Sequence, residues 1–394
     1  MSADPVQIFL VAGEESGDQL GAGLIRALRA RLGENLVFTG VGGRAMAGEG
    51  LTSLFPLTDI AVMGINAVIA RLPTILRRVY SVVDAVVAAR PDVLVVIDSA
   101  EFTHAVARRV RRRAPGLPIV NYVSPSVWAW RPGRARKMRA YIDHVLALKP
   151  FEPDAHLRLG GPPCTYVGHP LVERIAELRP SEGERPPIDA SPAHLVVLPG
   201  SRGTEIRRLM GPFGDTVALL AEQSGRELDI VLPAVAHLSD EIRRLAETWP
   251  VKPRIVEGEA AKYAAFRRAG LALAASGTVT LELAMAGVPM VAAYKVSKIE
   301  EQLKYLIKVP SIVLANLILG ENVIPERVQW DCTPDKMVAA LLPLLSDTPE
   351  RARQIQAFAR LDAIMEIGRP TSPSERAAEV VAAVIAQAQT KTPG

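Results

Sequence analysis

The stretch HLVVLPGSRGTEI, residues 194–206, decides the fold that we expect for this chain. Its start, His194–Leu198, is an apolar run with the length of a buried strand. A glycine-containing turn follows directly, and a helical pattern begins after the turn. Residues 271–282, LALAASGTVTLE, repeat this order. Strands, short turns and helices in repeated succession are typical of a parallel α/β sheet.

The turns of both stretches are predicted anion sites. The first turn of a helix leaves backbone N–H groups without partners and carries a partial positive charge, so it binds phosphate. In the second stretch Ser276, Gly277 and Thr278 form the turn. Glu282 follows about one helical turn later, where its carboxylate can accept hydrogen bonds from a ribose diol. Either loop alone is more often an ordinary capped helix, but two in one half favour a nucleotide-diphosphate site.

The same alternation organises the whole chain into two halves. Short apolar runs separated by helical patterns lie at Gln7–Ala12, Leu36–Val41, Val93–Asp98, Ile119–Val123 and Val145–Leu148, and again at Leu195–Leu198, Asp229–Leu232, Arg254–Glu257, Leu271–Ala275 and Met290–Ala293. We therefore predict an α/β protein with two Rossmann-like domains facing a cleft. The predicted boundaries are 1–177 for the first domain, 178–193 for a proline-rich linker and 194–370 for the second domain. Residues 371–394 are expected to form a final helix and a frayed tail.

The segment NYVSPSVWAWRPGRAR, residues 121–136, combines a short strand with two tryptophans and three arginines. Trp128 and Trp130 beside Arg131 suit a surface that meets a phosphorylated, partly apolar ligand. From composition alone, an equally good interpretation is that the tryptophans fill the core and the arginines form a solvated face.

Residues 60–89 form an apolar segment whose central charges are Arg71, Arg77 and Arg78. Pro73 is expected to break this segment or to begin a new helix. A basic amphipathic helix of this kind can lie in a bilayer interface with its apolar face inward. On pattern alone, a buried core helix with snorkelling arginines is the more frequent explanation.

Composition indicates an ordinary folded protein. The chain has 394 residues, which favours two domains, and 49% of them are hydrophobic while 22% are charged. A net charge of +4 and a pI near 9.1 are too weak to indicate nucleic acid, but they suit a surface close to anionic lipid. The two cysteines, Cys164 and Cys332, lack metal-ligand spacing, so no zinc site is expected. We expect neither a signal peptide, since Met1–Pro5 has no basic residue, nor a membrane-spanning run.

Taken together, these segments resemble the lipid-A-disaccharide synthase family, inverting glycosyltransferases of bacterial outer-membrane biogenesis. The matching stretches are AGEESGD (12–18), VGGRAM (41–46), MG (63–64), IDSAEF (97–102), NYVSPSVWAWR (121–131), KPFEP (149–153), YVGHPL (166–171), LPGSRGTEI (198–206), SGTVTLE (276–282) and NLILGENVIPERVQ (316–329). They follow the family order, and the tryptophan-containing and SGT motifs together are highly specific. Where the family usually has Pro, Asp and Asn, this chain has Ala100, Glu101 and Thr103. A role that rests on an aspartate at position 101 therefore does not carry over.

The resemblance implies the GT-B glycosyltransferase fold and a defined reaction. UDP-2,3-diacylglucosamine would be joined to 2,3-diacylglucosamine 1-phosphate through a β-1,6 linkage, with release of UDP. Because the donor is an α-glycosyl phosphate, a β product requires in-line inversion, a general base for the acceptor 6-hydroxyl and stabilisation of the departing diphosphate. No Asp-x-Asp motif for a metal–nucleotide bridge is present, and neither a metal nor a cofactor is expected. No nucleic-acid partner is expected, and the oligomeric state stays open, with a homodimer among the alternatives.

The resemblance and the turn pattern together imply three groups of site residues. The donor group is Arg202, Ser276, Gly277, Thr278, Glu282, Asn316, Glu326 and Gln329; the acceptor group is Glu15, Ser16, Asp18, Trp128, Arg131 and His169; the membrane group is Val68, Ile69, Leu72, Arg77 and Arg78. Because both substrates carry acyl chains, the resemblance favours the membrane interpretation of residues 60–89. Peripheral attachment to anionic lipid at the inner face of the cytoplasmic membrane is then expected. GT-B enzymes also commonly pack their last helix back on the first domain.

Asp98 is the predicted general base. It ends the apolar run Val93–Ile97, at the carboxyl edge of the sheet where a partly desolvated carboxylate makes an effective base. Two alternatives stay open: Asp98 caps the helix that follows, or Glu15 or Asp18 in the first strand–helix loop is the base. His169, after a strand-like run, is a weaker candidate for a phosphate contact or a second proton carrier.

Three other functions fit parts of the sequence. A sugar-nucleotide epimerase needs a base and a UDP site, but it has no use for a lipid surface or for the pair Trp128 and Trp130. A nicotinamide dehydrogenase needs G-x-G-x-x-G, whereas the first turn reads GEESGD. A non-catalytic lipid-binding protein would use residues 60–89 but has no need for Arg202 or Glu282.

Overall fold

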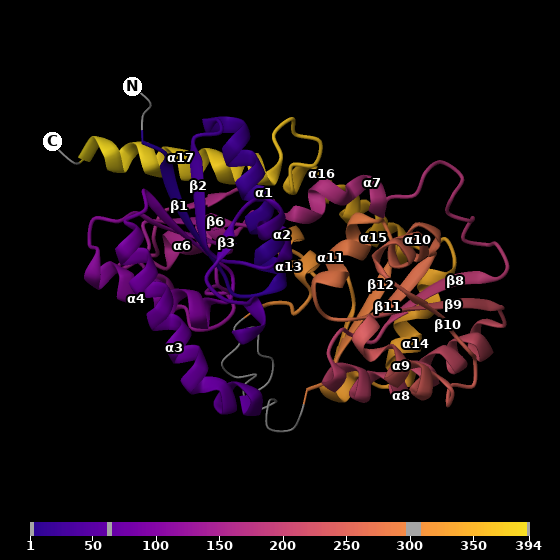
Figure 1. Ribbon diagram of the computed structural model, residues 1–394. Coiled ribbons are helices and arrows are strands. Elements are labelled where there is room, and N and C mark those ends of the chain that lie inside the picture. Colours follow the sequence, from indigo (N-terminus) through magenta and orange to yellow (C-terminus); the bar gives the residue numbers. More distant parts are fainter. Residues whose placement is uncertain (1–3, 61–64, 297–308, 392–394) are drawn as a thin grey trace. The chain divides into compact units, whose positions relative to one another are not determined.

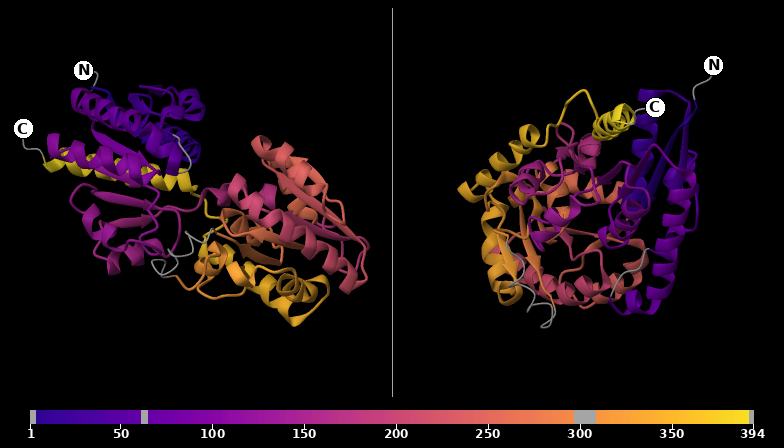
Figure 2. Two further views of the ribbon diagram at one scale, coloured as in Figure 1. Left: turned by 90° about the horizontal axis from the view of Figure 1, so that it is seen from below. Right: turned by 90° about the vertical axis from the view of Figure 1, so that its left-hand side faces the viewer.

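The computed structural model describes residues 4–60, 65–296 and 309–391, and the chain forms two compact units (Figures 1 and 2). Residues 1–170 and 369–394 belong to the first unit, and residues 171–368 belong to the second. The chain passes between the units twice, each time beside a Gly-x-Pro sequence, at residues 168–170 and 368–370. Gly168 and Gly368 have φ of +101° and +85°, a region that glycine adopts at no steric cost.

The first unit is built on a seven-stranded sheet. Its strands are β1 (Val6–Ala12), β2 (Leu36–Val41), β3 (Thr52–Ser53), β4 (Val93–Ile97), β5 (Ile119–Tyr122), β6 (His144–Ala147) and β7 (Cys164–Tyr166), in the order β3-β2-β1-β4-β5-β6-β7 with parallel pairing. Its helices are α1 (Glu15–Leu32), α2 (Arg44–Gly48), α3 (Ile65–Ala89), α4 (Ala100–Arg113), α5 (Gly133–Met138), α6 (Glu152–Arg158) and α17 (Pro373–Lys391). The predicted strands of this half are confirmed, and β7 is the strand-like run expected before His169, while the short strand β3 was not expected from the sequence.

Helices cover both faces of this sheet, as a parallel sheet requires. Along β1, Ile8 and Leu10 are buried in a cluster with α1 and α17, whereas Phe9 and Val11 are buried in a cluster with α3 and α4. Alternate residues of a strand point to opposite faces, so an unbroken apolar run is buried on both sides. Helix α17, the end of the chain, lies along α1 in the first unit (Figure 1).

The second unit repeats the architecture on a six-stranded sheet. Its strands are β8 (Ala193–Leu198), β9 (Leu228–Ala234), β10 (Arg254–Glu257), β11 (Leu271–Ala275), β12 (Met290–Tyr294) and β13 (Glu326–Val328), in the order β10-β9-β8-β11-β12-β13 with parallel pairing. Its helices include α7 (Ile175–Leu178), α8 (Gly203–Ser224), α9 (Ser239–Ala246), α10 (Glu259–Arg268), α11 (Thr278–Met285), α13 (Leu314–Leu319), α14 (Pro334–Leu341), α15 (Pro349–Ala359) and α16 (Leu361–Ile364). Two Rossmann-like units therefore confirm the predicted fold class.

Residues 178–193, expected as a linker, pack within the second unit instead. The guanidinium of Arg185 donates hydrogen bonds to the carbonyl oxygens of Phe266, Arg267, Ala286 and Gly287, where α10 and α11 end. The negative ends of two helices make this a favourable place for a cation. Burial lowers the pKa of Arg185 to about 10, so the side chain stays charged at neutral pH. Residues 178–193 therefore form a strap, a segment that Arg185 holds against α10 and α11. The chain passes from the first unit to the second before this strap begins.

Helix α3 runs from Ile65 to Ala89 with Pro73 inside it, so the expected break at this proline is absent. The second half of the helix buries Val79, Val82 and Val86 against the sheet. This packing outweighs the hydrogen bond that a proline removes from the helix ladder. Among the described residues, no helix combines the length and the apolar character needed to span a membrane.

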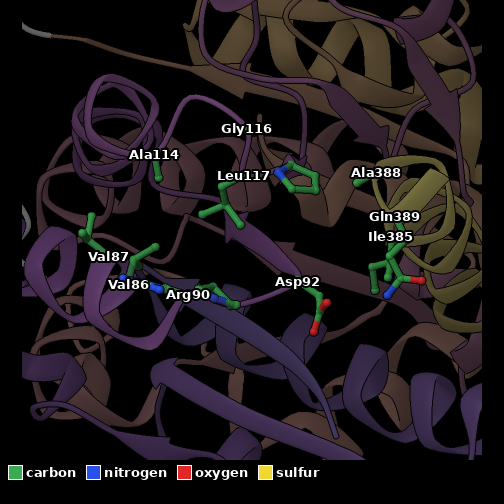
Figure 3. A pocket seen from close by; sticks show the side chains of 12 residues that line it. Val86, Val87, Arg90, Asp92, Ala114, Gly116, Leu117, Ile385, Ala388 and Gln389 are labelled. Carbon is green, nitrogen blue, oxygen red and sulfur yellow. The ribbon is translucent and has the colours of Figure 1, made fainter. Parts of the chain in front are cut away.

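In both sheets the strand order reverses beside the first strand, between β1 and β4 and between β8 and β11. Open parallel sheets bind ligands at the carboxyl ends of the strands at such a switch point. The opposite edge of the first sheet carries a shallow pocket of about 300 Å³, lined by Arg90, Asp92, Leu117 and, from α17, Ile385 (Figure 3). This pocket lies at the amino ends of β4 and β5. The expected ligand-binding position is at the carboxyl ends of the same strands.

Candidate active site

Asp98 lies at the switch point of the first sheet, directly after β4. Its backbone has φ of +54°, and the next residue, Ser99, has φ of +41°. Residues other than glycine rarely adopt a positive φ, and residues with this backbone conformation are frequent at functional sites. A Cβ on Gly13 in the neighbouring loop would lie 2.1 Å from Ser99 Cβ, so the two loops meet only because residue 13 is glycine. The fold thus holds Asp98 in an uncommon conformation at the expected ligand-binding edge.

The Asp98 carboxylate makes two short contacts. Oδ1 accepts a hydrogen bond from the backbone N–H of Ser99 at 2.7 Å, and Oδ2 accepts one from the Ser16 hydroxyl at 3.1 Å. Helix α4 begins at Ala100 with Ser99 as its cap residue, and no side-chain capping hydrogen bond is formed. Asp98 Oδ1 bonds to the N–H of this cap residue and not to an N–H within the first turn of α4, while Ser16 is placed to orient the other oxygen. The capping alternative stays open beside the role as base.

A pocket of about 460 Å³ opens beside Asp98. Its lining is Glu14, Asp98, Ser99, Ala100, Glu101, Val123, Ser124, Pro125, Ser126, Val127, Trp130, Arg134 and Lys149. A second strained residue, Val123 with φ of +78°, follows the neighbouring strand β5. The pocket therefore combines three acids with two cations and an indole, which is suited to a polar ligand with an anionic group.

Of the two predicted acceptor residues in the tryptophan segment, Trp128 is half-buried and anchored to α6. Its indole Nε1 donates to Glu152 Oε1 at 3.2 Å, and its ring meets Phe151 edge-on at 5.1 Å. Arg131 is exposed, and its guanidinium lies 4.0 Å from the centre of the Trp130 ring. Trp130, rather than Trp128, lines the pocket.

The structure gives Asp18 a different position from the one expected. Its side chain is buried and accepts hydrogen bonds from the backbone N–H groups of Gly43 at 2.7 Å, Ala45 at 2.8 Å and Met46 at 3.1 Å. Asp18 therefore anchors the start of α2, and both of its carboxylate oxygens are engaged by backbone donors of that segment. Glu15 is exposed at the start of α1, while its neighbour Glu14 lines the pocket.

His169 is buried, and burial together with the charge of Lys149 lowers its pKa to about 3. The imidazole is therefore neutral at physiological pH and a weak proton acceptor, which disfavours a role in proton transfer. Sequence reasoning missed Lys149 and Arg134 as pocket residues. Glu101, which replaces the family aspartate, pairs with Arg134, and this hydrogen bond lowers the pKa of the Glu101 carboxyl.

The second unit carries a larger pocket, of about 550 Å³, at its own switch point. Its lining is Leu198, Gly200, Ser201, Arg202, Glu205, Pro233, Ala234, Val235, Ala236, Gly258, Glu259, Lys262, Ala275, Ser276, Gly277, Thr278, Val279 and Glu282. Five of the predicted donor residues are brought together here: Arg202, Ser276, Gly277, Thr278 and Glu282. Lys262 and Glu259 were not predicted, because nothing in the pattern of α10 separates them from a solvated helix face.

The first predicted anion loop is already occupied by a carboxylate of the chain. Glu205 Oε2 accepts hydrogen bonds from the backbone N–H groups of Ser201 at 3.1 Å and Arg202 at 3.2 Å. Gly200 permits this approach, because a Cβ there would lie 2.5 Å from that oxygen. The loop thus caps α8 from within, and its contribution to an anion site is the exposed guanidinium of Arg202.

The second loop, Ser276–Thr278, lines the pocket and differs from the first in how its N–H groups are used. Ser276 is used by the fold, since its N–H bonds to Ala293 O at 3.0 Å and its hydroxyl donates to Ile312 O at 2.7 Å. Within the described parts of the chain, no acceptor is seen for the backbone N–H groups of Gly277 and Thr278. The N-terminus of α11 is therefore the better phosphate site of the two.

Asn316 and Glu326, expected in the donor pocket, form a buried network beside it. Asn316 Nδ2 donates to Ile324 O and to Glu326 Oε1, and Asn316 Oδ1 accepts the N–H groups of Val323 and Ile324, all at 3.0–3.1 Å. Glu326 also accepts from Ser311. These side chains hold the segment whose Ile312 carbonyl receives the Ser276 hydroxyl, so they shape the pocket without lining it.

Gln329 lies after β13 with φ of +55°, and its Oε1 accepts the N–H of Val296 at 2.6 Å. It too lies outside the pocket lining. Among the residues that the structure describes, no group of three His, Cys, Asp or Glu side chains is placed to hold a metal ion.

Paired Rossmann-like units, each with a polar pocket at its switch point, define the GT-B class of enzymes. Two solved structures share the fold over 96% of this chain and 100% of their own: a UDP-GlcNAc 2-epimerase of Methanocaldococcus jannaschii, with a TM-score of 0.58 and 13% identity, and MurG of Acinetobacter baumannii, with a TM-score of 0.58 and 14% identity. Identities this low concern the fold alone. Residues 8–381 match the lipid-A-disaccharide synthetase family, and the chain belongs to this family.

Close relatives agree with the family assignment. A lipid-A-disaccharide synthase of Rhodopseudomonas palustris (strain HaA2) is 59% identical over 380 residues, which cover 96% of both chains. One of Nitrobacter winogradskyi is 59% identical over 382 residues, again with 96% coverage of both. The resemblance seen in the motifs is therefore confirmed.

Proposed function

We infer that this protein is a hexosyltransferase of lipid A biosynthesis. It joins UDP-2,3-diacylglucosamine to 2,3-diacylglucosamine 1-phosphate and releases UDP. The observation that carries the proposal is an acid held in a strained conformation at the β1/β4 switch point of a chain that belongs to the synthetase family. In this function Asp98 Oδ2 accepts the proton of the acceptor 6-hydroxyl while the Ser16 hydroxyl keeps the carboxylate oriented.

The donor is assigned to the pocket of the second unit. The N-terminus of α11 would receive the diphosphate and the Arg202 guanidinium would compensate the charge that develops on departing UDP. Glu282 would accept hydrogen bonds from the ribose hydroxyls. In the first unit, Arg134 and Lys149 are the cations of the pocket lining that would contact the acceptor phosphate, and each is also paired with an acid of the chain, Glu101 and Glu152.

The test of this function is UDP release. We expect purified protein to release UDP only when both lipid substrates are present, because in-line displacement needs the acceptor hydroxyl. An epimerase would change the UDP-sugar without an acceptor, and a passive lipid-binding protein would release nothing. UDP formation that does not depend on the acceptor would contradict the proposal.

We further propose that α3 attaches the protein to the inner face of the cytoplasmic membrane. Leu72, Leu76 and Tyr80 follow one another at four-residue spacing and are 47%, 42% and 54% exposed, so they form an apolar stripe along the part of α3 that precedes most of its buried valines. The exposed side chain of Arg77 lies on the same helix, and the guanidinium of Arg109 lies 5.1 Å from the centre of the Tyr80 ring. An apolar stripe flanked by arginines suits the interface of an anionic bilayer.

Three of the predicted membrane residues are not part of this exposed stripe. Arg78 is turned toward the protein, where it pairs with Asp59 and stacks over Phe55 at 4.5 Å. The side chains of Val68 and Ile69 lie outside the described residues. The exposed stripe Leu72, Leu76 and Tyr80 is therefore the better target for mutation.

Changing Leu72, Leu76 and Tyr80 together to Ser is expected to reduce flotation with anionic liposomes and to raise KM for the acylated substrates. Each arginine near anionic lipid retains ~1 kcal/mol of attraction, so binding is weakened and becomes more salt-sensitive. The melting temperature should stay close to wild type, because the three side chains are exposed. A matched control changes the exposed Leu32, Val37 and Leu157 of the same unit to Ser. Equal flotation of the stripe variant and the control would rule out α3 as the anchor.

A further inference from the structure

Lys262 lies in the donor pocket, on the first turns of α10, and faces Glu282 on α11. Its Nζ is 2.8 Å from Glu282 Oε2. The geometry points to Lys262 as a positioning residue that holds Glu282 for recognition of the ribose of a nucleoside diphosphate. This inference rests on the proposed donor site and goes beyond it, because it names the group that sets the ribose contact.

The burial of the pair explains why Glu282 needs a cation. The Glu282 side chain is 11% exposed and that of Lys262 is 23% exposed, and Oε2 itself is shielded from solvent. A buried carboxylate is costly unless a charge or a donor faces it. The contact is an ion pair without the alignment of a hydrogen bond, so the carboxylate keeps acceptor capacity for further donors. The ammonium therefore faces one oxygen of Glu282 without using up the lone pairs of the carboxylate.

The neighbours of Lys262 favour Glu282 as the partner of its ammonium group. The nearest acid on its own helix, Glu259, is engaged by Arg174 and accepts the Tyr263 hydroxyl at 3.0 Å. The ammonium lies against an aromatic wall, 4.8 Å from the centre of the Tyr263 ring and 5.9 Å from that of Phe266. Aromatic faces attract a cation and limit where it can go. Lys262 is thus held between this wall and Glu282, at one side of the pocket.

A carboxylate fixed at one oxygen presents the other in a defined direction. The two hydroxyls of a ribose diol are hydrogen-bond donors that such an oxygen can accept. Without Lys262, the Glu282 side chain would be free to rotate, and the ribose would lose an acceptor held in a fixed position. The consequence is a loss of discrimination between ribose and 2′-deoxyribose, which a purely structural ion pair would not produce.

The experiment compares UDP and 2′-deoxy-UDP by calorimetry on the full-length protein and its variants. Wild type is expected to prefer UDP by about tenfold or more, the range of one or two hydrogen bonds to a charged group. Lys262→Met should weaken UDP binding by about tenfold and leave 2′-deoxy-UDP nearly unchanged, so that the preference collapses. Lys262→Arg should keep most of the preference. Lys262→Met combined with Glu282→Gln should lose no more than Glu282→Gln alone, because the two residues act as one unit.

Each alternative outcome decides against the inference. A Lys262→Met variant that still prefers UDP as wild type does would remove Lys262 from ribose recognition. Equal weakening of both nucleotides would mean that the ammonium contacts the diphosphate directly, or supports the fold alone.

Lys252→Met, on an exposed lysine bonded to the Glu247 carbonyl, is the control for loss of charge. If Lys262→Met does not fold by thermal melt, Lys262→Arg and Glu282→Gln still test the inference, since only the second should lose the preference. Failure of wild type to bind UDP would instead overturn the proposed donor site.

Discussion

Asp98→Asn is expected to lower kcat by about 10²–10⁴ and to leave UDP affinity unchanged. The amide keeps the size of the side chain and can still meet Ser16, but it cannot accept the proton of the acceptor hydroxyl. The proposed UDP pocket belongs to the second unit, and its lining contains no residue of the first. The loss should therefore appear in turnover and not in nucleotide binding.

The measurement is UDP release at saturating concentrations of both lipids, with calorimetry of UDP on the same samples. Asp92→Asn is the matched control, because Asp92 lies just before the other end of β4 and only receives the N–H of Gln7 at 2.8 Å. Glu14→Gln and Glu15→Gln test the competing acids of the first loop. Near-normal turnover of Asp98→Asn, or a larger loss in either glutamate variant, would move the base to that loop.

Asn316→Ala is expected to lower the free energy of unfolding of the second unit by on the order of 3 kcal/mol. The change leaves the buried N–H group of Ile324 without its acceptor. It also removes one of two partners from the N–H of Val323, which keeps Glu321 O, and from Glu326 Oε1, which keeps the Ser311 hydroxyl. Unsatisfied buried polar groups each cost about 1–3 kcal/mol. UDP affinity should fall only as a consequence, because the segment that receives the Ser276 hydroxyl loses its support.

Denaturant unfolding of Asn316→Ala and Asn322→Ala provides the comparison. Asn322 lies on the same segment and makes one exposed hydrogen bond, to Pro310 O at 3.2 Å, so its loss should change stability by less than about 1 kcal/mol. Arg202→Ala should show the opposite behaviour, with unchanged unfolding and UDP binding weaker by about 1–3 kcal/mol. An Asn316→Ala protein of normal stability that binds UDP poorly would return Asn316 to direct contact with the donor.

The positions of helix N-termini and strand ends were predictable because they depend on neighbouring residues. The runs Val93–Ile97 and Leu271–Ala275 form strands, and Asp98 and Ser276 follow them directly. Parallel strands bring their carboxyl ends to one edge, so this local pattern already places Asp98 at a ligand-binding edge. The same reasoning brought Arg202 and Glu282 to one pocket.

The partners of polar side chains could not be predicted in this way. Aspartate and asparagine are common in functional sites, yet Asp18 and Asn316 accept hydrogen bonds from backbone N–H groups of other segments of the chain. Lys262 appeared to be a surface lysine, and only the packing of α10 beside α11 brings its ammonium to Glu282. The identity of a residue limits what it can bond, but the partner is chosen by distance in space.

Local sequence alone therefore determined the α/β class, the two-unit organisation and the family of this protein, because strand length, turn composition and motif order are properties of contiguous residues. Tertiary structure alone decided that residues 178–193 form a strap and that α3 exposes Leu72, Leu76 and Tyr80 while it buries its valines. The same holds for the internal occupation of the first anion loop by Glu205. Each of these outcomes depends on burial and on hydrogen bonds between groups whose spatial distance the chain order does not set.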